Sequence, residues 1–107
     1  MGVESWYQVR YDAAGIHRAA QPPGAAAWSD TLAWAAILRV CLEMEGFLGS
    51  ETLNLFSRHR PESHAIPVPA EGTAALIGEL VKRGLLDGDL AIQAATSEGL
   101  FCWPPER

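Results

Sequence analysis

The chain has 107 residues, of which 49% are hydrophobic and 20% charged, which is typical of one folded globular domain and excludes a disordered chain or two independent cores. The formal net charge of −5 gives no overall attraction to polyanions, although a local basic face is compatible with it. No apolar run approaches the roughly 18 residues that cross a bilayer, and residues 1–11 lack the basic-then-apolar layout of a signal peptide. We therefore expect a single domain over residues 1–107, in the cytoplasm and without membrane contact.

The cysteines agree with that location. Cys41 and Cys102 are too few for a disulfide framework, and both lie among apolar neighbours. They are interpreted as two small buried hydrophobic side chains in a reducing compartment, with a bridge or a reactive thiol as the alternative.

The N-terminal quarter predicts one short strand. Residues 5–11 alternate, with aromatic and β-branched side chains, as a strand does. Residues 12–15 are typical of a turn, and residues 17–20 are interpreted as a short turn of helix. Residues 21–24, which include Pro22 and Pro23, must break regular structure.

Two helices and a loop are expected next. Ser29 is a good N-cap with Trp28 as a hydrophobic staple, so a central helix is predicted over residues 32–44, ended by Gly46. Ser50 would cap a second helix over residues 51–57. Residues 58–68, with two prolines, two arginines and two histidines, predict an exposed loop.

The C-terminal part predicts a third helix and a hairpin. The helix would begin at Pro69 and end at Gly84, which suits the left-handed C′ position, with Leu85 packing back. Gly72 and Gly78 weaken this helix by about 1 kcal/mol each relative to alanine, and each either permits close packing or has no special role. Residues 89–94 and 100–103 alternate and would form a hairpin around the turn at residues 96–99. The fold class is therefore α+β and mainly helical.

This order of elements resembles a winged helix-turn-helix domain: a short N-terminal strand, three helices and a C-terminal β-hairpin. Residues 79–86 (ELVKRGLL) are similar to the exit of a recognition helix into the wing. The chain also resembles, over roughly residues 5–103, N-terminal domains of replication-type and uncharacterised proteins from actinobacterial phages. The matching segments are Trp6-Tyr7, residues 17–20, residues 45–48 and residues 84–86, with Gly49 in place of an expected proline.

The resemblance implies a nucleic-acid-binding accessory or regulatory domain of phage-like type. Its third helix would enter the major groove of duplex DNA, with Thr73 at a base edge. Arg58 and Arg60 would hold backbone phosphate. A solvated loop in which Arg60 pairs with Glu62 is the alternative. Lys82 and Arg83 at the far end of the third helix would be further contacts, and a solvated helix cap is the alternative explanation of these two residues.

A second reading is a protein–protein interaction module on a winged-helix scaffold that does not bind DNA. Trp6 and Trp103 would bind the partner if they are exposed, or pack together if the first strand pairs with the hairpin. A homodimer would double a weak site. We expect no enzyme and no cofactor, because no nucleophile elbow or Gly-rich phosphate loop occurs. No metal is expected either, because His59, Glu62, His64 and Cys102 lack the close pairing of zinc ligands.

Overall fold

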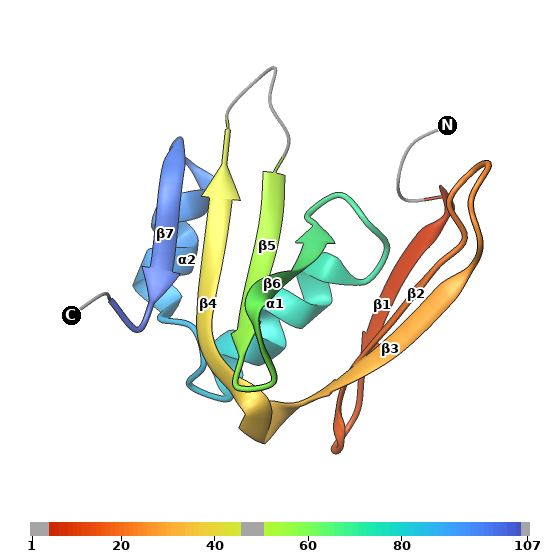
Figure 1. Ribbon diagram of the computed structural model, residues 1–107. Coiled ribbons are helices and arrows are strands. Elements are labelled where there is room, and N and C mark those ends of the chain that lie inside the picture. Colours follow the sequence, from red (N-terminus) through yellow and green to blue (C-terminus); the bar gives the residue numbers. More distant parts are fainter. Residues whose placement is uncertain (1–4, 46–50, 106–107) are drawn as a thin grey trace.

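Two antiparallel sheets and two α-helices make up the computed structural model, which describes residues 5–45 and 51–105 (Figure 1). The first sheet has the order β1-β2-β3 and the second the order β6-β5-β4-β7, with a 3-10 helix, η2, between β3 and β4. The elements are β1 (Tyr7–Tyr11), β2 (Gly15–Ala20), β3 (Trp28–Ala33), η2 (Trp34–Ala36), β4 (Ile37–Met44), β5 (Glu51–Ser57), β6 (Arg60–Pro67), α1 (Thr73–Lys82), α2 (Gly88–Ala95) and β7 (Gly99–Trp103).

The first sheet is a three-stranded meander. The predicted strand at the N-terminus is confirmed as β1, in which Tyr7 and Val9 are buried and Gln8 is exposed. The predicted turn at residues 12–15 is also confirmed: the Asp12 carboxylate accepts a hydrogen bond from the Ala14 backbone N–H at 2.8 Å. The short helix expected at residues 17–20 is wrong, because this segment is β2 and pairs with both β1 and β3.

The predicted central helix over residues 32–44 is wrong as well. Its place is taken by the end of β3, by η2 and by β4, which lies between β5 and β7. The broad apolar stripe that favoured a helix comes from a strand whose core-facing side chains are buried and whose other face is buried only at Cys41. Val40 and Leu42 point into the core, and Cys41 is 4% exposed on the opposite face. A continuous apolar run of this length fits a buried strand as well as a helix.

The segment after it forms a hairpin. β5 and β6 replace the predicted second helix over residues 51–57 and the predicted loop over residues 58–68. Leu53, Leu55 and Ser57 are buried at every second position of β5, which is the strand period. The helix stop predicted at Gly46 and the cap predicted at Ser50 lie outside the described residues.

The third predicted helix is confirmed as α1, although it begins at Thr73 rather than Pro69. Its end is the predicted glycine cap. Gly84 has φ 76°, its N–H donates to the Val81 carbonyl at 3.0 Å, and the Leu85 N–H donates to the Leu80 carbonyl at 2.9 Å. At the other end, the Val9 N–H donates to the Glu71 carbonyl at 3.0 Å, and a Cβ on Gly72 would lie 2.0 Å from the Val9 carbonyl oxygen. Gly72 therefore permits the close approach of α1 to β1.

The predicted C-terminal hairpin is wrong. Residues 88–95 form α2, whose N-cap is Asp87: its carboxylate accepts a hydrogen bond from the Leu90 N–H at 3.0 Å. The strand at the C-terminus is confirmed as β7, but it pairs with β4. The fold is therefore mainly β rather than mainly helical, and no helix-turn-helix or wing is present in the described residues. This removes the structural basis of the winged-helix and DNA-binding interpretation.

The helices cover one face of the four-stranded sheet, and the three-stranded sheet stands to one side of it (Figure 1). The core fills the space between these layers. Its largest fully buried side chains come from both sheets and from α1, among them Ile16, Leu53, Leu55, Ile66, Leu76 and Leu80. Within the described residues, no helix is both long and apolar enough to span a membrane.

Candidate functional site

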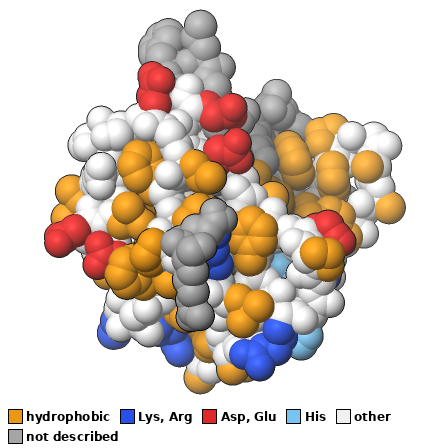
Figure 2. Space-filling view, turned by 60° about the vertical axis from the view of Figure 1, so that its left-hand side comes forward, with side chains coloured by type: hydrophobic (Ala, Val, Ile, Leu, Met, Phe, Trp, Pro, Cys, Tyr) orange, Lys and Arg blue, Asp and Glu red, His pale blue; other side chains and the backbone are white. Residues whose placement is uncertain are grey.

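The basic residues predicted to contact DNA are gathered at one end of the molecule. Arg58 and Arg60 flank the turn between β5 and β6, and Lys82 and Arg83 lie at the end of α1. We call these four residues the basic end. Lys and Arg side chains lie mostly in the lower part of the space-filling view, and many of the acidic side chains lie higher (Figure 2). On the face shown there, the positive and negative side chains therefore lie largely apart.

The helix η2 brings the two halves of the basic end together. The Arg58 guanidinium donates a hydrogen bond to the Ala35 carbonyl at 2.8 Å. The Arg83 guanidinium lies 4.0 Å from the centroid of the Trp34 ring and forms an ion pair with Glu79 at 2.8 Å. Arg60 donates to the main-chain oxygens of Glu62 and Ser63, so the ion pair expected between Arg60 and the Glu62 carboxylate is not the contact observed.

Thr73, the fifth residue predicted at the DNA interface, is not available to a ligand. It is completely buried at the start of α1, and its hydroxyl donates to the Pro67 carbonyl at 2.9 Å. A side chain in this position contributes to the core and to the start of the helix. The predicted base contact of Thr73 is therefore excluded by its burial.

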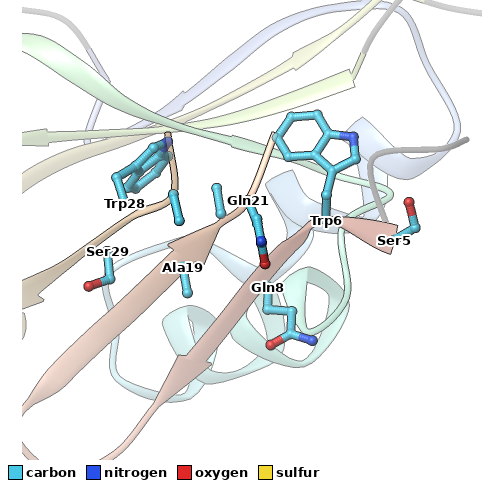
Figure 3. Close-up of a pocket in the computed structure, with 9 residues that line it drawn as sticks. Ser5, Trp6, Gln8, Ala19, Gln21, Trp28 and Ser29 are labelled. Atoms are coloured by element: carbon cyan, nitrogen blue, oxygen red, sulfur yellow. The ribbon is translucent and has the colours of Figure 1, made fainter. Parts of the chain in front are cut away.

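A pocket lies at the end of the first sheet, where β1 and β3 begin and β2 ends (Figure 3). Its volume is about 490 Å³. The lining side chains are aromatic, amide, hydroxyl and methyl groups, and none is charged: Ser5, Trp6, Gln8, Ala19, Ala20, Gln21, Ala27, Trp28 and Ser29. Ligand pockets typically combine such apolar walls with a few polar groups.

Two tryptophans form opposite sides of this pocket (Figure 3). The Tyr7 ring contacts both of them: its centroid is 6.1 Å from that of Trp6 and 5.9 Å from that of Trp28, edge to face in both cases. Trp28 is 39% exposed, and the Arg18 guanidinium lies 4.9 Å from its ring centroid. The two indoles are thus held in place by a buried ring and keep an accessible surface.

Two glutamines supply the amide groups of the pocket. Gln8 points from the outer face of β1, where its side-chain NH₂ donates to the Glu71 carboxylate at 3.1 Å. Gln21 follows β2, and its backbone N–H donates to the Trp6 carbonyl at 2.8 Å, which joins the two strand ends. The side chain of Gln21 is exposed.

A buried hydrogen-bond network supports the pocket from beneath. Arg18 is 7% exposed and makes a bidentate ion pair with Asp30, with Nε 2.8 Å from one carboxylate oxygen. Arg18 and the Tyr7 hydroxyl both donate to the carbonyl oxygen of Ala65 in β6, at 3.1 Å and 3.0 Å. The first sheet is therefore fixed to the edge of the second by two side chains that bond to the same acceptor.

The network also sets the protonation of its members. Burial raises the pKa of the Tyr7 hydroxyl, so the group stays protonated and can donate. The hydrogen bonds from Arg18 lower the pKa of the Asp30 carboxyl, so that this group stays ionised.

The predicted partner-binding tryptophans lie in different sheets. Trp6 lines the pocket, whereas Trp103 lies on β7 opposite Val40, half-buried against the core. The first strand pairs with β2, so the packing of Trp6 on Trp103 through a shared sheet does not occur. Sequence reasoning missed Trp28, which it assigned to a helix staple. Residues 28–33, WSDTLA, show no regular apolar–polar alternation, and only Leu32 among them is buried, so no local pattern marked this strand.

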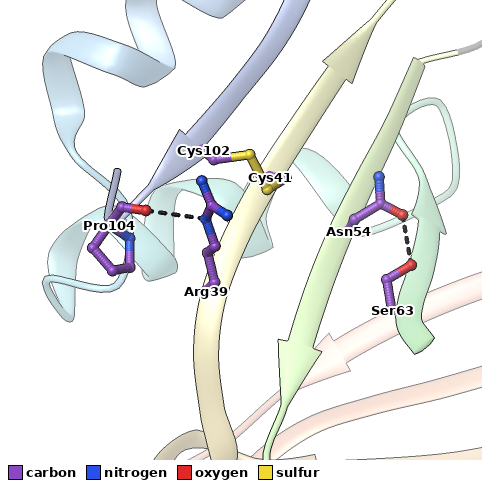
Figure 4. The surroundings of a disulfide bond; sticks show 6 residues. All are labelled: Arg39, Cys41, Asn54, Ser63, Cys102 and Pro104. Carbon is purple, nitrogen blue, oxygen red and sulfur yellow. Dashed lines mark hydrogen bonds between the residues drawn. A yellow bond between two sulfur atoms is a disulfide. The ribbon is translucent and has the colours of Figure 1, made fainter. Parts of the chain in front are cut away.

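The open face of the four-stranded sheet carries a disulfide (Figure 4). Cys41 and Cys102 are directly paired across β4 and β7 and are joined to each other. Nearby, Arg39 donates to the Pro104 carbonyl at 3.1 Å, and Ser63 donates to the Asn54 side chain at 3.0 Å. The expectation of two reduced thiols is therefore wrong. The cysteines therefore no longer argue for a cytoplasmic location, since disulfides persist mainly in oxidising compartments.

Within the part of the chain that the structure describes, no cluster of three His, Cys, Asp or Glu side chains is placed to hold a metal ion. Comparison with protein families, with curated proteins and with solved structures finds no match for this chain. The pocket is therefore interpreted from its own chemistry.

Proposed function

We propose that this protein is a protein-binding module which holds an uncharged segment of its partner in the pocket between Trp6 and Trp28. The observation that carries this proposal is a pocket of about 490 Å³ with two indole walls and no charged side chain in its lining. A charged ligand group would lose its hydration there without gaining a counter-ion.

The lining matches the chemistry of a polypeptide. Indole faces bury proline, aliphatic or aromatic side chains, and tryptophan is prominent among the residues that dominate binding energy at interfaces. The carboxamides of Gln8 and Gln21 offer donors and acceptors of the kind that a peptide group needs. The three alanines of the lining add only small apolar groups to it.

Nucleic-acid binding has less support. The net charge is −5, and the helix that was expected to read DNA has a buried Thr73 at its start. The four cations of the basic end are the remaining argument for it. They would give a few phosphate contacts and weak, salt-sensitive binding.

The test is a comparison of three forms of the full chain immobilised on a resin: wild type, Trp28→Ala and Leu100→Ala. Leu100 is 66% exposed on β7 and is the matched control for removing an exposed apolar side chain. Extract from the source cells is passed over each, and retained proteins are quantified by mass spectrometry. We expect a partner retained by wild type and Leu100→Ala and reduced roughly 30-fold by Trp28→Ala, as for an interface hot spot.

Thermal unfolding of the three forms checks that Trp28→Ala still folds. Equal retention of every protein by wild type and Trp28→Ala would reject the proposal. A gel-shift assay with duplex DNA at 50 mM salt tests the competing function on the same samples.

The cytoplasmic location stays a prediction. Alkylation of the protein inside its cells, before lysis, would report the state of Cys41 and Cys102. Two labelled thiols would favour the cytoplasm, and the disulfide would favour an oxidising compartment.

A further inference from the structure

β3 is an edge strand of the first sheet. Among the described strands, only β2 pairs with β3. Its six residues, WSDTLA, contain no proline and no lysine, the residues with which proteins commonly protect an edge. An edge strand of this kind presents a row of backbone donors and acceptors to any extended chain that approaches it.

Of the two edge strands of the second sheet, β6 and β7, the one that lies beside the first sheet differs from β3. β6 has Pro61 near its start and Pro67 at its end, and proline cannot donate to an added strand. In addition, the carbonyl of Ala65 already accepts hydrogen bonds from Tyr7 and Arg18. Of β3 and β6, β3 is the one left suited to strand addition.

β3 also joins the two surface features described above. It begins at Trp28, in the pocket, and ends at Ala33, directly before η2 (Figure 1). Arg58 and Arg83 are both held against η2, by Ala35 and by Trp34. A chain extended along β3 therefore passes from the uncharged pocket to the basic end. At about 3.3 Å per residue, the six residues of β3 are matched by about six residues of that chain.

We propose that the partner segment is an extended acidic polypeptide that adds to the edge of β3 as a further strand. An uncharged side chain of this segment enters the pocket, and an Asp or Glu about six residues away meets the basic end. The inference rests on the proposed function, because it takes the pocket as the anchor point.

Charge complementarity selects this occupant. Arg58, Arg60 and Lys82 make no ion pair with a carboxylate within the described residues, although the chain as a whole is acidic. The carboxylates of an acidic segment would find ion-pair partners in these three cations. A second copy of the chain could also pair with β3 in the antiparallel direction. The uncharged pocket end of one copy would then lie beside the basic end of the other, and β3 of the second copy would supply no carboxylate to the basic end.

The experiment selects binders from a library of random twelve-residue peptides displayed on a surface, with the folded full chain as bait. We expect an uncharged anchor residue, with Asp or Glu enriched five to seven positions away. Trp28→Ala should abolish the selection. The double variant Arg58→Gln/Arg60→Gln should retain the anchor and lose the acidic preference, and it should bind a selected peptide about fivefold more weakly, as expected for one exposed ion pair.

The matched control is Gln93→Glu/Ser97→Glu, which lowers the net charge by the same amount at exposed positions in and after α2. It should bind the selected peptide as wild type does. Hydrogen exchange of the amides of residues 28–33 should slow when the peptide binds, because an added strand protects the edge.

The outcomes separate the two proposals. Peptides with an anchor but without an acidic preference, or unchanged exchange in β3, would overturn the inference and leave the pocket as a binding site. Binding that is insensitive to Trp28→Ala would overturn both. A concentration-dependent dimer that protects residues 28–33 without peptide would assign the edge to a second copy instead.

Discussion

At the scale of single residues, Arg18 and Asp30 show how a charge is accommodated between the sheets. Arg18 is nearly buried, and its guanidinium donates hydrogen bonds to the Asp30 carboxylate, the Tyr7 hydroxyl and the Ala65 carbonyl. The same side chain lies against the Trp28 ring. Loss of this pair would therefore weaken both the contact between the sheets and the support of the pocket.

The pair makes stability depend on pH in a defined direction. Arg18 lowers the pKa of Asp30 below its ordinary value of 3.8. A carboxyl with a depressed folded-state pKa contributes stability above its unfolded pKa and loses it as the pH falls through the folded pKa. The contribution of the ion pair should therefore be full at pH 7 and be lost as the pH falls below 3.8 and through the lowered folded-state pKa.

We predict that Asp30→Asn lowers the free energy of unfolding at pH 7 by about 1–2 kcal/mol, a value discounted because the Asp30 side chain is 36% exposed. Urea denaturation at pH 7, 5, 4 and 2.5 measures the difference from wild type, which should shrink towards zero at the lowest pH. Arg18→Met provides the second arm of a double-mutant cycle. A coupling energy that stays constant over this pH range would contradict the assignment.

At the scale of elements, α1 is defined by its two ends more than by its middle. Its start is held on β1 through Glu71 and Gly72, and its end is closed by the cap at Gly84. Between them, Gly78 has no atom within 4 Å of the place where its Cβ would lie. The same residue type therefore has three different roles within one helix.

We predict that alanine substitutions at Gly84 and Gly78 act in opposite directions. Gly84→Ala should destabilise the protein by about 1 kcal/mol because φ is 76° there, and an L side chain is strained in that conformation. Gly78→Ala should stabilise it by about 0.5–1 kcal/mol by favouring the helix. Thermal and urea unfolding measure both, and each variant is the control for the other. Equal effects would show that the cap does not depend on glycine.

At the scale of the whole molecule, the disulfide joins the middle and the end of the chain. Cys41 and Cys102 are separated by 61 residues, and the loop between them contains β5, β6 and both helices. Closing a loop of that length restricts the unfolded chain, with an effect on stability of roughly 2–4 kcal/mol.

We predict that reduction with dithiothreitol lowers the free energy of unfolding by that amount, roughly 2–4 kcal/mol. Cys41→Ala/Cys102→Ala should show a loss of similar size, with no further response to the reductant. Urea denaturation with and without reductant measures both. If the reductant leaves wild type unchanged while thiol counting shows two free cysteines, the bridge has no role in stability.

Several local features could be predicted from the sequence because their causes are local. The strands at residues 7–11 and 99–103, the Asp12 turn and the end of α1 at Gly84 all depend on neighbouring residues. Trp6 lines the pocket, and its role in binding a partner stays a prediction. Length, composition and charge excluded a disordered chain and indicated a domain with little attraction to polyanions.

Only the tertiary structure decided the identity of β2, β4, β5 and β6, and with it the fold class. Apolar runs such as residues 37–44 suit a buried strand or a helix equally, and the choice depends on partners that are distant in the chain. The pocket, the basic end and the disulfide likewise depend on the tertiary structure. Each joins residues from separate elements, as Cys41 and Cys102 do, and no local pattern specifies which strands become neighbours. Local backbone preferences act within a few residues, whereas the place of β4 between β5 and β7 depends on pairing with strands that are distant in the chain.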